Sequence, residues 1–362
     1  MRILIIGAGP SGSYAASILA KHHDVSVLEE HSTIGTPVQC TGIITDDIFR
    51  FIPKNHKSIC NKVKDVRIIS PLGSVLDIRL QKPDVIIDRT EFDRHFYNEA
   101  KEAGAMFYLK KKFINHKGNK ASVKNLASGK KLQLEFDCLI GADGPQSAVA
   151  KSASMFGHRK FFIGVQAVIR KRNDNCIEFF PRKNGFGWSV PVDDDHLRVG
   201  FASTNRTRDE FQALLKRYEG KVLETQGGLI PLYDPTQQFQ SGSIFLVGDA
   251  ATFVKATTGG GIIPGLESAE LASKAIDERK DYASLLKRKV CPSLSLNLKM
   301  RKIMNTFSDE EWDKLIIELD NEHSRKVFSK VNRDRIFPLV AKTAIANPKL
   351  MKYAFKRFNL LF

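Results

Sequence analysis

The feature that most constrains this chain is a glycine pattern near its start, Gly7-x-Gly9-x-x-Gly12. The apolar run Ile3–Ile6 precedes it, as expected for a buried parallel strand, and an alanine-rich helix is expected over 13–21. In this context Gly7 permits a tight turn, Gly9 lets the backbone approach a pyrophosphate, and Gly12 permits close packing of helix on strand. The segment therefore predicts an α/β, Rossmann-like fold that binds a dinucleotide.

An acidic residue at the end of the second predicted strand narrows the choice of dinucleotide. The strand covers 25–28, and Glu29 follows it directly. A carboxylate there accepts hydrogen bonds from a ribose diol and disfavours a 2′-phosphate, so FAD or NAD is expected rather than NADP. Glu30 is the competing candidate, but its side chain should point to the other face of the strand. The turn that opens the helix is expected to bind the phosphates. The cofactor-binding residues predicted in this N-terminal segment are Gly7, Gly9, Pro10, Ser11, Gly12 and Glu29.

Two later motifs decide for a flavin. Gly141-Ala142-Asp143-Gly144 follows an apolar strand at 138–140, and the sequence Phe-Leu-Val-Gly248-Asp249 follows another apolar run. With the N-terminal pattern, in this order, they resemble the signatures of the p-hydroxybenzoate-hydroxylase-like flavoproteins. The resemblance implies that Asp249, next to Gly248, hydrogen-bonds the ribityl chain of FAD. It also implies that Asp143 and Gly144 lie beside the pyrophosphate.

A glycine run opens the long helix that is expected from about Gly260 to Ile276. It reads Gly259-Gly260-Gly261-Ile262, and a helix N-terminus of this kind presents backbone N–H groups and a positive dipole end. Reduced flavin carries negative charge near N1 and O2. The run is therefore predicted to stabilise the reduced cofactor and favour hydride chemistry.

The chain up to about residue 280 resembles the geranylgeranyl reductase family, whose archaeal members saturate isoprenoid chains of membrane lipids. The resemblance rests on the segment 35–42, Gly-Thr-Pro-Val-Gln-Cys-Thr-Gly, on 87–94, Ile-Asp-Arg-Thr-Glu-Phe-Asp-Arg, and on the aromatic segment 180–191. It implies that Cys40 and Gly42 lie near the flavin and that Arg89 contacts FAD. From the residues alone, Cys40 is equally a buried small residue and Arg89 a cation at a helix start.

The aromatic segment is the predicted substrate site. Phe180, Phe186, Trp188 and Pro191 are the candidates, and with Phe179 they would line a tunnel for an apolar tail; packing within a sheet is the alternative. Phe186 stands where the family commonly has tyrosine, and Val190 where it has phenylalanine. These departures bear on chain-length preference more than on chemistry.

The expected organisation is a discontinuous FAD-binding domain over 1–155 and 240–280. An antiparallel-sheet substrate domain, 156–239, is interleaved with it, and a helical, basic C-terminal region covers 281–362. Hydrophobic residues make up 42% of the chain and charged residues 27%, which excludes disorder.

The net charge of +16 favours anionic partners. From Lys342 to Phe362 there is no acid, and the cations Lys342, Lys349, Lys352, Lys356 and Arg357 are interleaved with apolar residues. This tail predicts peripheral binding to an anionic membrane surface, or else packing on its own protein. No nucleic-acid-binding module or metal-ligand cluster is indicated. The scattered cysteines indicate no disulfide framework, so reduced thiols are expected. The expected location is the cytoplasm, peripheral to the inner face of the cell membrane. The uncharged stretch 3–20 is broken by glycines and is not a signal peptide.

The resulting expectation is FAD-dependent reduction of isoprenoid double bonds, by hydride from flavin N5 and protonation of the other alkene carbon. Cys40 and water are the candidate proton donors, Cys40 being the one candidate catalytic residue. Electrons would come from NAD(P)H or a ferredoxin-type protein. The alternatives are an FAD-dependent monooxygenase or halogenase, although a halogenase would have Trp-x-Trp-x-Ile-Pro where this chain lacks the first tryptophan. A non-catalytic, membrane-associated flavin-binding protein is the alternative from another class.

Overall fold

The computed structural model describes residues 1–350 and 353. Residues 351–352 and 354–362, which include Lys352, Lys356 and Arg357 of the predicted basic tail, lie outside the described residues.

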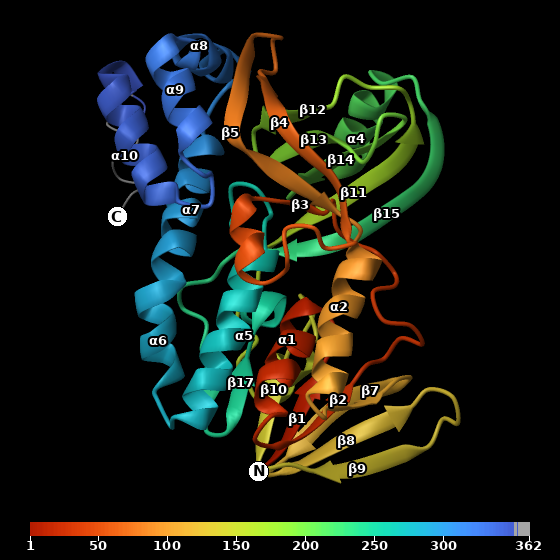
Figure 1. Ribbon diagram of the computed structural model, residues 1–362. Helices are drawn as coiled ribbons and strands as arrows, with labels where there is room; N and C mark the ends of the chain where they lie inside the picture. Colours follow the sequence, from red (N-terminus) through yellow and green to blue (C-terminus); the bar gives the residue numbers. More distant parts are fainter. Residues whose placement is uncertain (351–352, 354–362) are drawn as a thin grey trace.

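A six-stranded sheet forms the lower half of the molecule in Figure 1. Its strands, in spatial order, are β16 (Gln240–Ser241), β17 (Ile244–Leu246), β10 (Cys138–Gly141), β1 (Arg2–Ile6), β2 (Asp24–Leu28) and β6 (Met106–Tyr108). All neighbours pair in parallel except β16 with β17. The sheet is the predicted Rossmann-like core, and its central strands are buried on both faces.

Three helices pack beside one another on this half: α1 (Pro10–Leu19), α2 (Arg89–Glu102) and α5 (Ile262–Asp277). The helix α1 begins three residues earlier than the sequence predicted. Pro10 is its first residue, where a fixed φ suits the helix and the missing N–H would have had no partner. Gly9 is therefore its N-cap.

An eight-stranded sheet forms the upper half. Its order is β15 (Lys221–Pro231), β11 (Phe161–Arg170), β14 (His196–Ser203), β13 (Gly185–Pro191), β12 (Cys176–Arg182), β4 (Ile59–Ile69), β5 (Val75–Ile87) and β3 (Ile43–Ile44). Pairing is antiparallel except between β12 and β4. The strands β3 to β5 come from within the first 155 residues, yet they extend the sheet of the middle segment. The domain boundaries themselves stay a prediction.

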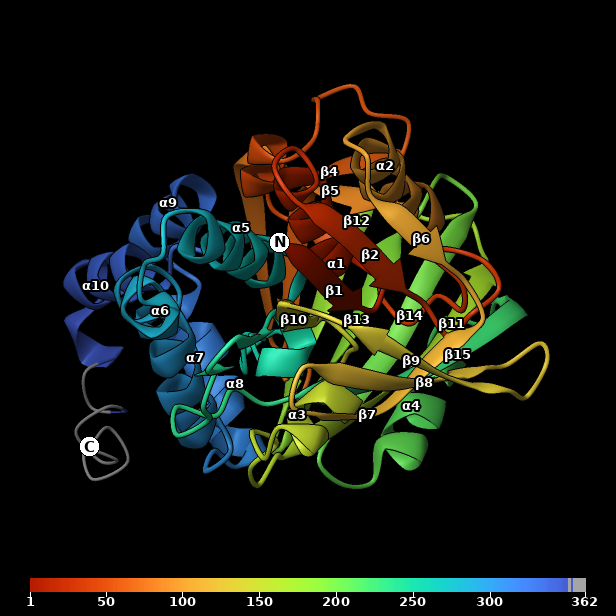
Figure 2. The ribbon, with the colours of Figure 1, turned by 90° about the horizontal axis from the view of Figure 1, so that it is seen from below.

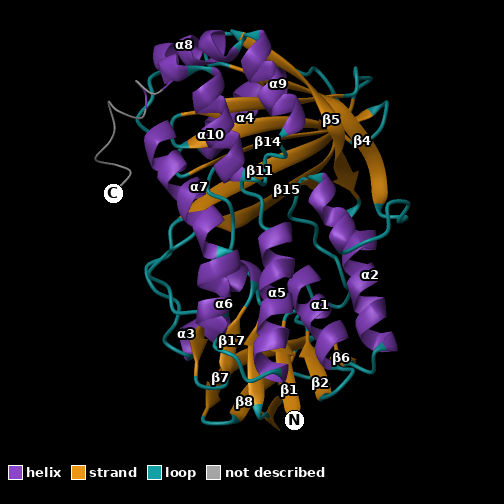
Figure 3. Ribbon diagram, turned by 60° about the vertical axis from the view of Figure 1, so that its left-hand side comes forward, coloured by secondary structure: helices purple, strands orange, loops and turns teal. Residues whose placement is uncertain are grey.

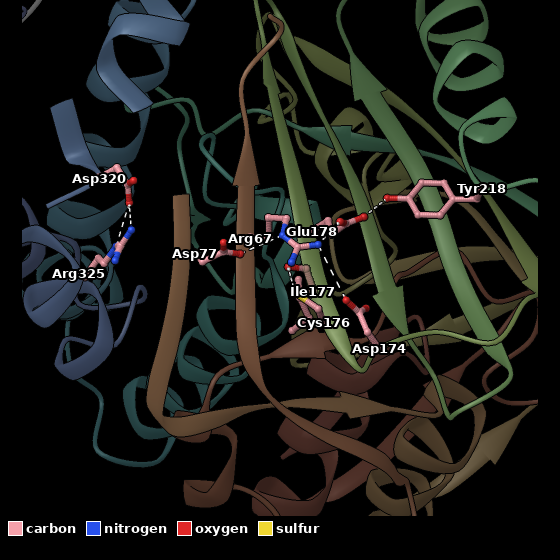
Figure 4. Close-up of polar contacts among 9 residues, drawn as sticks. All are labelled: Arg67, Asp77, Asp174, Cys176, Ile177, Glu178, Tyr218, Asp320 and Arg325. Atoms are coloured by element: carbon pink, nitrogen blue, oxygen red, sulfur yellow. Dashed lines mark hydrogen bonds and ion pairs between the residues drawn. The ribbon is translucent and has the colours of Figure 1, made fainter. Parts of the chain in front are cut away.

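The parallel junction between β4 and β12 carries a charged bridge, shown in Figure 4. Arg67 of β4 lies 2.9 Å from Asp77 of β5 and 3.2 Å from Glu178 of β12. Glu178 also accepts a hydrogen bond from the Tyr218 hydroxyl. These contacts join three neighbouring strands on the face away from the motifs.

The remaining elements cover the two sheets. A small antiparallel sheet, β7 (Lys111–Lys117), β8 (Lys120–Asn125) and β9 (Lys131–Glu135), adds Phe113 and Val123 to the core of the six-stranded sheet. The helix α3 (Ala148–Ser152) packs near it, and α4 (Thr207–Lys216) packs on β14 and β11. The short 3₁₀ helices are η1 (Asp46–Arg50), η2 (Gly248–Ala251) and η3 (Pro348–Leu350).

From residue 281 to 350 the chain is mostly helical, as predicted. It comprises α6 (Tyr282–Lys289), α7 (Cys291–Met304), α8 (Asp309–Leu319), α9 (Glu322–Lys330) and α10 (Ile336–Ala346). Figure 3 shows α6 and α7 running alongside both halves, with α8 to α10 beside the upper sheet. Among the described residues, no helix combines the length and apolarity needed to cross a bilayer.

Candidate functional site

A cavity of about 700 Å³ lies between the two sheets. It is bounded by the carboxyl ends of the parallel strands, the N-termini of α1 and α5, and one face of the upper sheet. This is where ligands bind in open α/β folds. All of the predicted cofactor-binding residues except Gly12 line this one cavity.

The three glycines of the first motif have the geometry that a pyrophosphate cradle requires. Gly7 has a φ of +100°, and a Cβ there would lie 2.3 Å from the carbonyl oxygen of Ala142. A Cβ on Gly12 would lie 2.0 Å from the carbonyl oxygen of Gly7. A Cβ on Gly9 would meet no atom within 4 Å, because this N-cap faces the open cavity. The helix N-terminus is thus bare where an anion would bind.

Glu29 and Glu30 both line the cavity but have different partners. Glu29 turns inward, and its carboxylate accepts hydrogen bonds from the N–H groups of Ala8 and His31, both at 2.9 Å. Glu30 is more exposed and forms an ion pair with Lys112 at 2.8 Å. The contact of Glu29 with a ribose stays a prediction.

Both oxygens of the Asp143 carboxylate are hydrogen-bonded within the protein. Its two oxygens accept hydrogen bonds from the Ser147 hydroxyl, at 2.6 Å, and from the Val149 N–H, at 3.0 Å. Burial raises its pKa. Asp143 therefore fixes the start of α3, and this places Ala142 against Gly7.

Asp249 is in the opposite situation. Among the described residues, no donor hydrogen-bonds its carboxylate, which lines the cavity beside Gly261. Burial raises the pKa of Asp249 to about 6, although the charges of Arg89 and Arg159 oppose the shift. The side chain is only partly buried, and its carboxylate faces the cavity. The hydroxyl groups of a ribityl chain would supply the missing donors.

The glycine run forms a loop that leads to the bare N-terminus of α5. Gly261 is the N-cap, and no side chain caps the helix. Gly259 has a φ of +69°, and a Cβ there would lie 3.2 Å from Cζ of Phe186. The loop therefore presents helix N–H groups to the cavity and touches the aromatic wall.

A buried cation fixes the position of this loop. Arg301 of α7 is only 2% exposed and has no acidic partner among the described residues. It donates to the carbonyls of Ala256 at 2.9 Å and Thr257 at 2.6 Å, and to Gly185 of β13 at 3.3 Å. Burial lowers the pKa of Arg301 to about 10. Its guanidinium also lies over the ring of Phe186, at 5.4 Å.

The predicted Cys40 segment forms another wall of the cavity. Arg89, the first residue of α2, is held by two contacts of 3.1 Å to Asp93 and lies beside the Cys40 thiol. Burial opposes the charge of Arg89, but Asp93 and Cys40 raise its pKa overall. The Gly42 N–H donates to Sγ of Cys40 at 3.3 Å.

Gln166 of β11 anchors this segment, and sequence reasoning missed it. Its amide donates to the Cys40 carbonyl, at 3.1 Å, and accepts from the Thr41 hydroxyl, at 2.9 Å. It also contacts Trp188 Nε1 at 3.4 Å and Gln226 at 2.5 Å, so all of its hydrogen-bonding groups are used. Its signal in the sequence is its place as a lone polar residue within the apolar run 161–169.

Two of the four predicted substrate-site residues line the cavity, and the other two do not. Phe186 and Trp188 line the cavity, together with Phe179. Phe180 instead lies on the opposite face of the sheet, buried in a core with Phe201 and Phe211, because successive strand residues alternate in direction. Pro191 is buried at the end of β13 and does not line the cavity.

A loop between α9 and α10 completes the wall, and no pattern in the sequence indicated it. Arg333 and Asp334 line the cavity. Four successive residues, 332–335, each reach an earlier part of the chain. The pairs are Asn332 with Asp46, Arg333 with Asp84, Asp334 with Lys255 and Thr45, and Arg335 with Asp47. The pairs of Arg333 and Asp334 are largely buried.

These residues fit FAD. Gly9 leaves room for a pyrophosphate, Asp249 has an unsatisfied carboxylate where the ribityl chain would run, and the start of α5 offers donors to a flavin ring. Arg159, which sequence reasoning also missed, ties the two motifs together by donating to the carbonyls of Pro145, at 2.8 Å, and Ala250, at 2.5 Å. The individual contacts with FAD stay predictions.

The chain is similar to known dinucleotide-binding proteins. Residues 5–50 match the model of an NAD(P)-binding Rossmann-like domain, and residues 63–219 match that of an FAD binding domain. The chain is 28% identical to digeranylgeranylglycerophospholipid reductase 3 of Methanosphaera stadtmanae, over 91% of this chain and 93% of that protein. It is 27% identical to digeranylgeranylglycerophospholipid reductase 1 of Methanothermobacter thermautotrophicus, over 90% and 92%.

Solved structures share the fold. The geranylgeranyl bacteriochlorophyll reductase-like protein of Thermoplasma acidophilum superposes with a TM-score of 0.86 at 22% identity, covering 98% of both chains. The flavin-dependent halogenase CmlS superposes with a TM-score of 0.69 at 17% identity, covering 99% of this chain and 78% of that one.

Gly9→Val should release FAD, because the added side chain enters open space at the anion site, and the flavin-free variant should melt at nearly the same temperature as flavin-free wild type. Gly12→Val is the matched control: the same side chain collides with the Gly7 carbonyl, so this variant should also melt at a lower temperature. Flavin absorbance per protein and thermal unfolding measure the two effects. Full flavin occupancy in Gly9→Val would refute the assignment of the cradle.

Asp249→Asn should weaken FAD by about 1.5–3 kcal/mol through the loss of charge-assisted hydrogen bonds. The variant should also remove a pH dependence from the flavin-free protein. The folded-state pKa of Asp249, about 6, is above its ordinary value of 3.8, so the folded state holds the proton more tightly. The stabilisation from this group is full below pH 3.8 and is lost as the pH rises to about 6.

Urea unfolding of the flavin-free protein at several pH values in this window measures the effect. The wild type should lose stability, relative to Asp249→Asn, as the pH rises. Parallel profiles for the two proteins would contradict the placement of Asp249 in a position where partial burial disfavours its charge.

Proposed function

We propose that this chain, an FAD-dependent oxidoreductase that belongs to the geranylgeranyl reductase family, reduces the isoprenoid C=C bonds of geranylgeranyl chains in archaeal-type membrane lipids. Relatives that bear the name of this lipid reductase cover about nine-tenths of the chain. The proposal extends their substrate class to this protein.

One observation carries the proposal: the apolar wall of the cavity meets the glycine loop at the flavin site. Phe186 approaches Gly259 closely, and Ile230 lies 3.6 Å from the same Cβ position. Trp188 fits beside them because its partner strand has Gly200, where a Cβ would lie 2.3 Å from the indole. A long apolar chain would thus have a continuous hydrophobic surface that leads to the redox-active position.

Bound FAD, when reduced, supplies a hydride at N5 for one alkene carbon. The residues of this chain do the remaining work. The N-terminus of α5 would stabilise the negative charge of the reduced flavin ring. The aromatic wall would hold the alkene and exclude water. The cavity lining offers Cys40 as a candidate proton donor for the other alkene carbon, with water as the alternative. We also propose NAD(P)H or a ferredoxin-type protein as the electron source, since the sequence has one dinucleotide fingerprint.

The test is to reduce the bound flavin without oxygen and then add a digeranylgeranyl phospholipid. The flavin should reoxidise, and the lipid should gain a pair of hydrogen atoms for each bond reduced, as measured by mass spectrometry. The fully saturated lipid is the matched control and should leave the flavin reduced. No reoxidation by the unsaturated lipid would contradict the proposal, and substrate-stimulated oxygen consumption would favour a monooxygenase.

Phe186→Ala and Phe180→Ala form a matched pair across the sheet. Phe186→Ala should slow lipid-dependent reoxidation roughly tenfold or more, because the alkene is held less well beside the flavin. Phe180→Ala should lower the free energy of unfolding by about 3–5 kcal/mol and leave the reoxidation rate of folded protein unchanged. If Phe180→Ala changed the rate more than Phe186→Ala, the assignment of the cavity wall would be wrong.

A further inference from the structure

The exposed face of α10 is apolar, which is unusual for an outer helix. Phe337 is 52% exposed, Val340 36% and Ile345 78%. Pro338 and Ala341 are exposed on the same helix, and Lys342 is its one exposed charge. The inner side of α10 packs on α9 and α7, so the outer apolar residues are not needed for that contact.

The charged residues of this segment are all basic, although Arg335 also lies 3.8 Å from Asp47 of the 3₁₀ helix η1. From Arg335 to Phe362 the sequence contains no acidic residue. Arg335, Lys342 and Lys349 are exposed near the two ends and the middle of α10. An apolar face with a cationic border complements an anionic lipid surface, where the lysine and arginine side chains meet headgroups and the apolar side chains meet the acyl boundary.

The position of α10 gives this face access to a large planar partner. Figures 1 and 2 show α10 at the outer edge of the molecule, on the side away from β15. Its N-cap, Arg335, directly follows Arg333 and Asp334, which line the cavity. A surface that binds α10 would therefore lie next to one wall of the cavity.

We propose that the exposed face of α10 docks on an anionic lipid bilayer. Phe337, Val340 and Ile345 enter the headgroup region, and the flanking cations hold the helix parallel to the surface. This inference rests on the exposed face and its charge, and it holds whether or not the lipid reduction proposed above occurs.

The experiment is cosedimentation of the full-length, FAD-loaded protein with vesicles. One set consists of phosphatidylcholine alone and the other of equal parts phosphatidylcholine and phosphatidylglycerol. The wild type should bind the anionic vesicles and bind the neutral ones weakly. High salt should reduce the binding only in part, because apolar insertion is not screened.

The double variant Phe337→Ser/Ile345→Ser should bind anionic vesicles at least tenfold more weakly, since each exposed apolar side chain adds about one order of magnitude when buried. Its flavin content and melting temperature should equal those of the wild type, because both side chains are exposed. Leu223→Ser is the matched control: Leu223 is 45% exposed on β15, on the other side of the molecule, and this variant should bind normally.

Three outcomes would overturn the proposal. The first is no binding of the wild type to anionic vesicles. The second is equal binding by the double variant and the wild type. The third is unchanged vesicle binding by the double variant together with a lower melting temperature or a changed oligomeric state. A lower melting temperature would show that the chain's own tail covers the face, and a changed oligomeric state would show that a second copy covers it.

Discussion

The shape of the cavity depends on a single buried cation. Arg301 joins three parts of the chain: α7, the segment before the glycine loop, and β13 of the upper sheet. An arginine buried without a carboxylate is tolerated only if its donors are satisfied, and here backbone carbonyls satisfy them. Because the segment that leads into the glycine loop and the strand that bears Phe186 bind the same guanidinium, Arg301 links the two ends of the cavity.

The parts of the site that the sequence predicted are those whose chemistry is local. Gly7, Gly9 and Gly12 act through the backbone of one strand–turn–helix unit, so their spacing alone indicates their roles. The same holds for Glu29 at a strand end and for the glycines that open α5. Except for Gly12, which packs against Gly7 behind the turn, each of these residues lines the cavity from the element that the sequence indicated.

The parts that could not be predicted depend on contacts between distant segments. Strand alternation shows that Phe179 and Phe180 face opposite sides of the sheet, but the choice of side follows from the placement of α4, which buries Phe180. Arg159, Lys255 and Arg301 are basic residues in a chain that is rich in them, so nothing local distinguishes these three from solvated cations. The roles of Lys255 and Arg301 arise only when the segment after residue 280 packs on the rest of the chain, and the role of Arg159 arises when Pro145 and Ala250 come together.

The loop at 332–335 is synthesised late, because it lies near the end of the chain. The glycine turn and Glu29 lie within the first thirty residues, whereas Arg333 and Asp334 are among the last to be synthesised. Chains begin to fold from the N-terminus as they leave the ribosome, so this wall of the cavity is the last to form. Until that loop reaches Asp46, Asp84 and Lys255, the growing protein lacks this wall of the cavity. The wall that Arg333 and Asp334 contribute can therefore form only when nearly the whole chain has been synthesised.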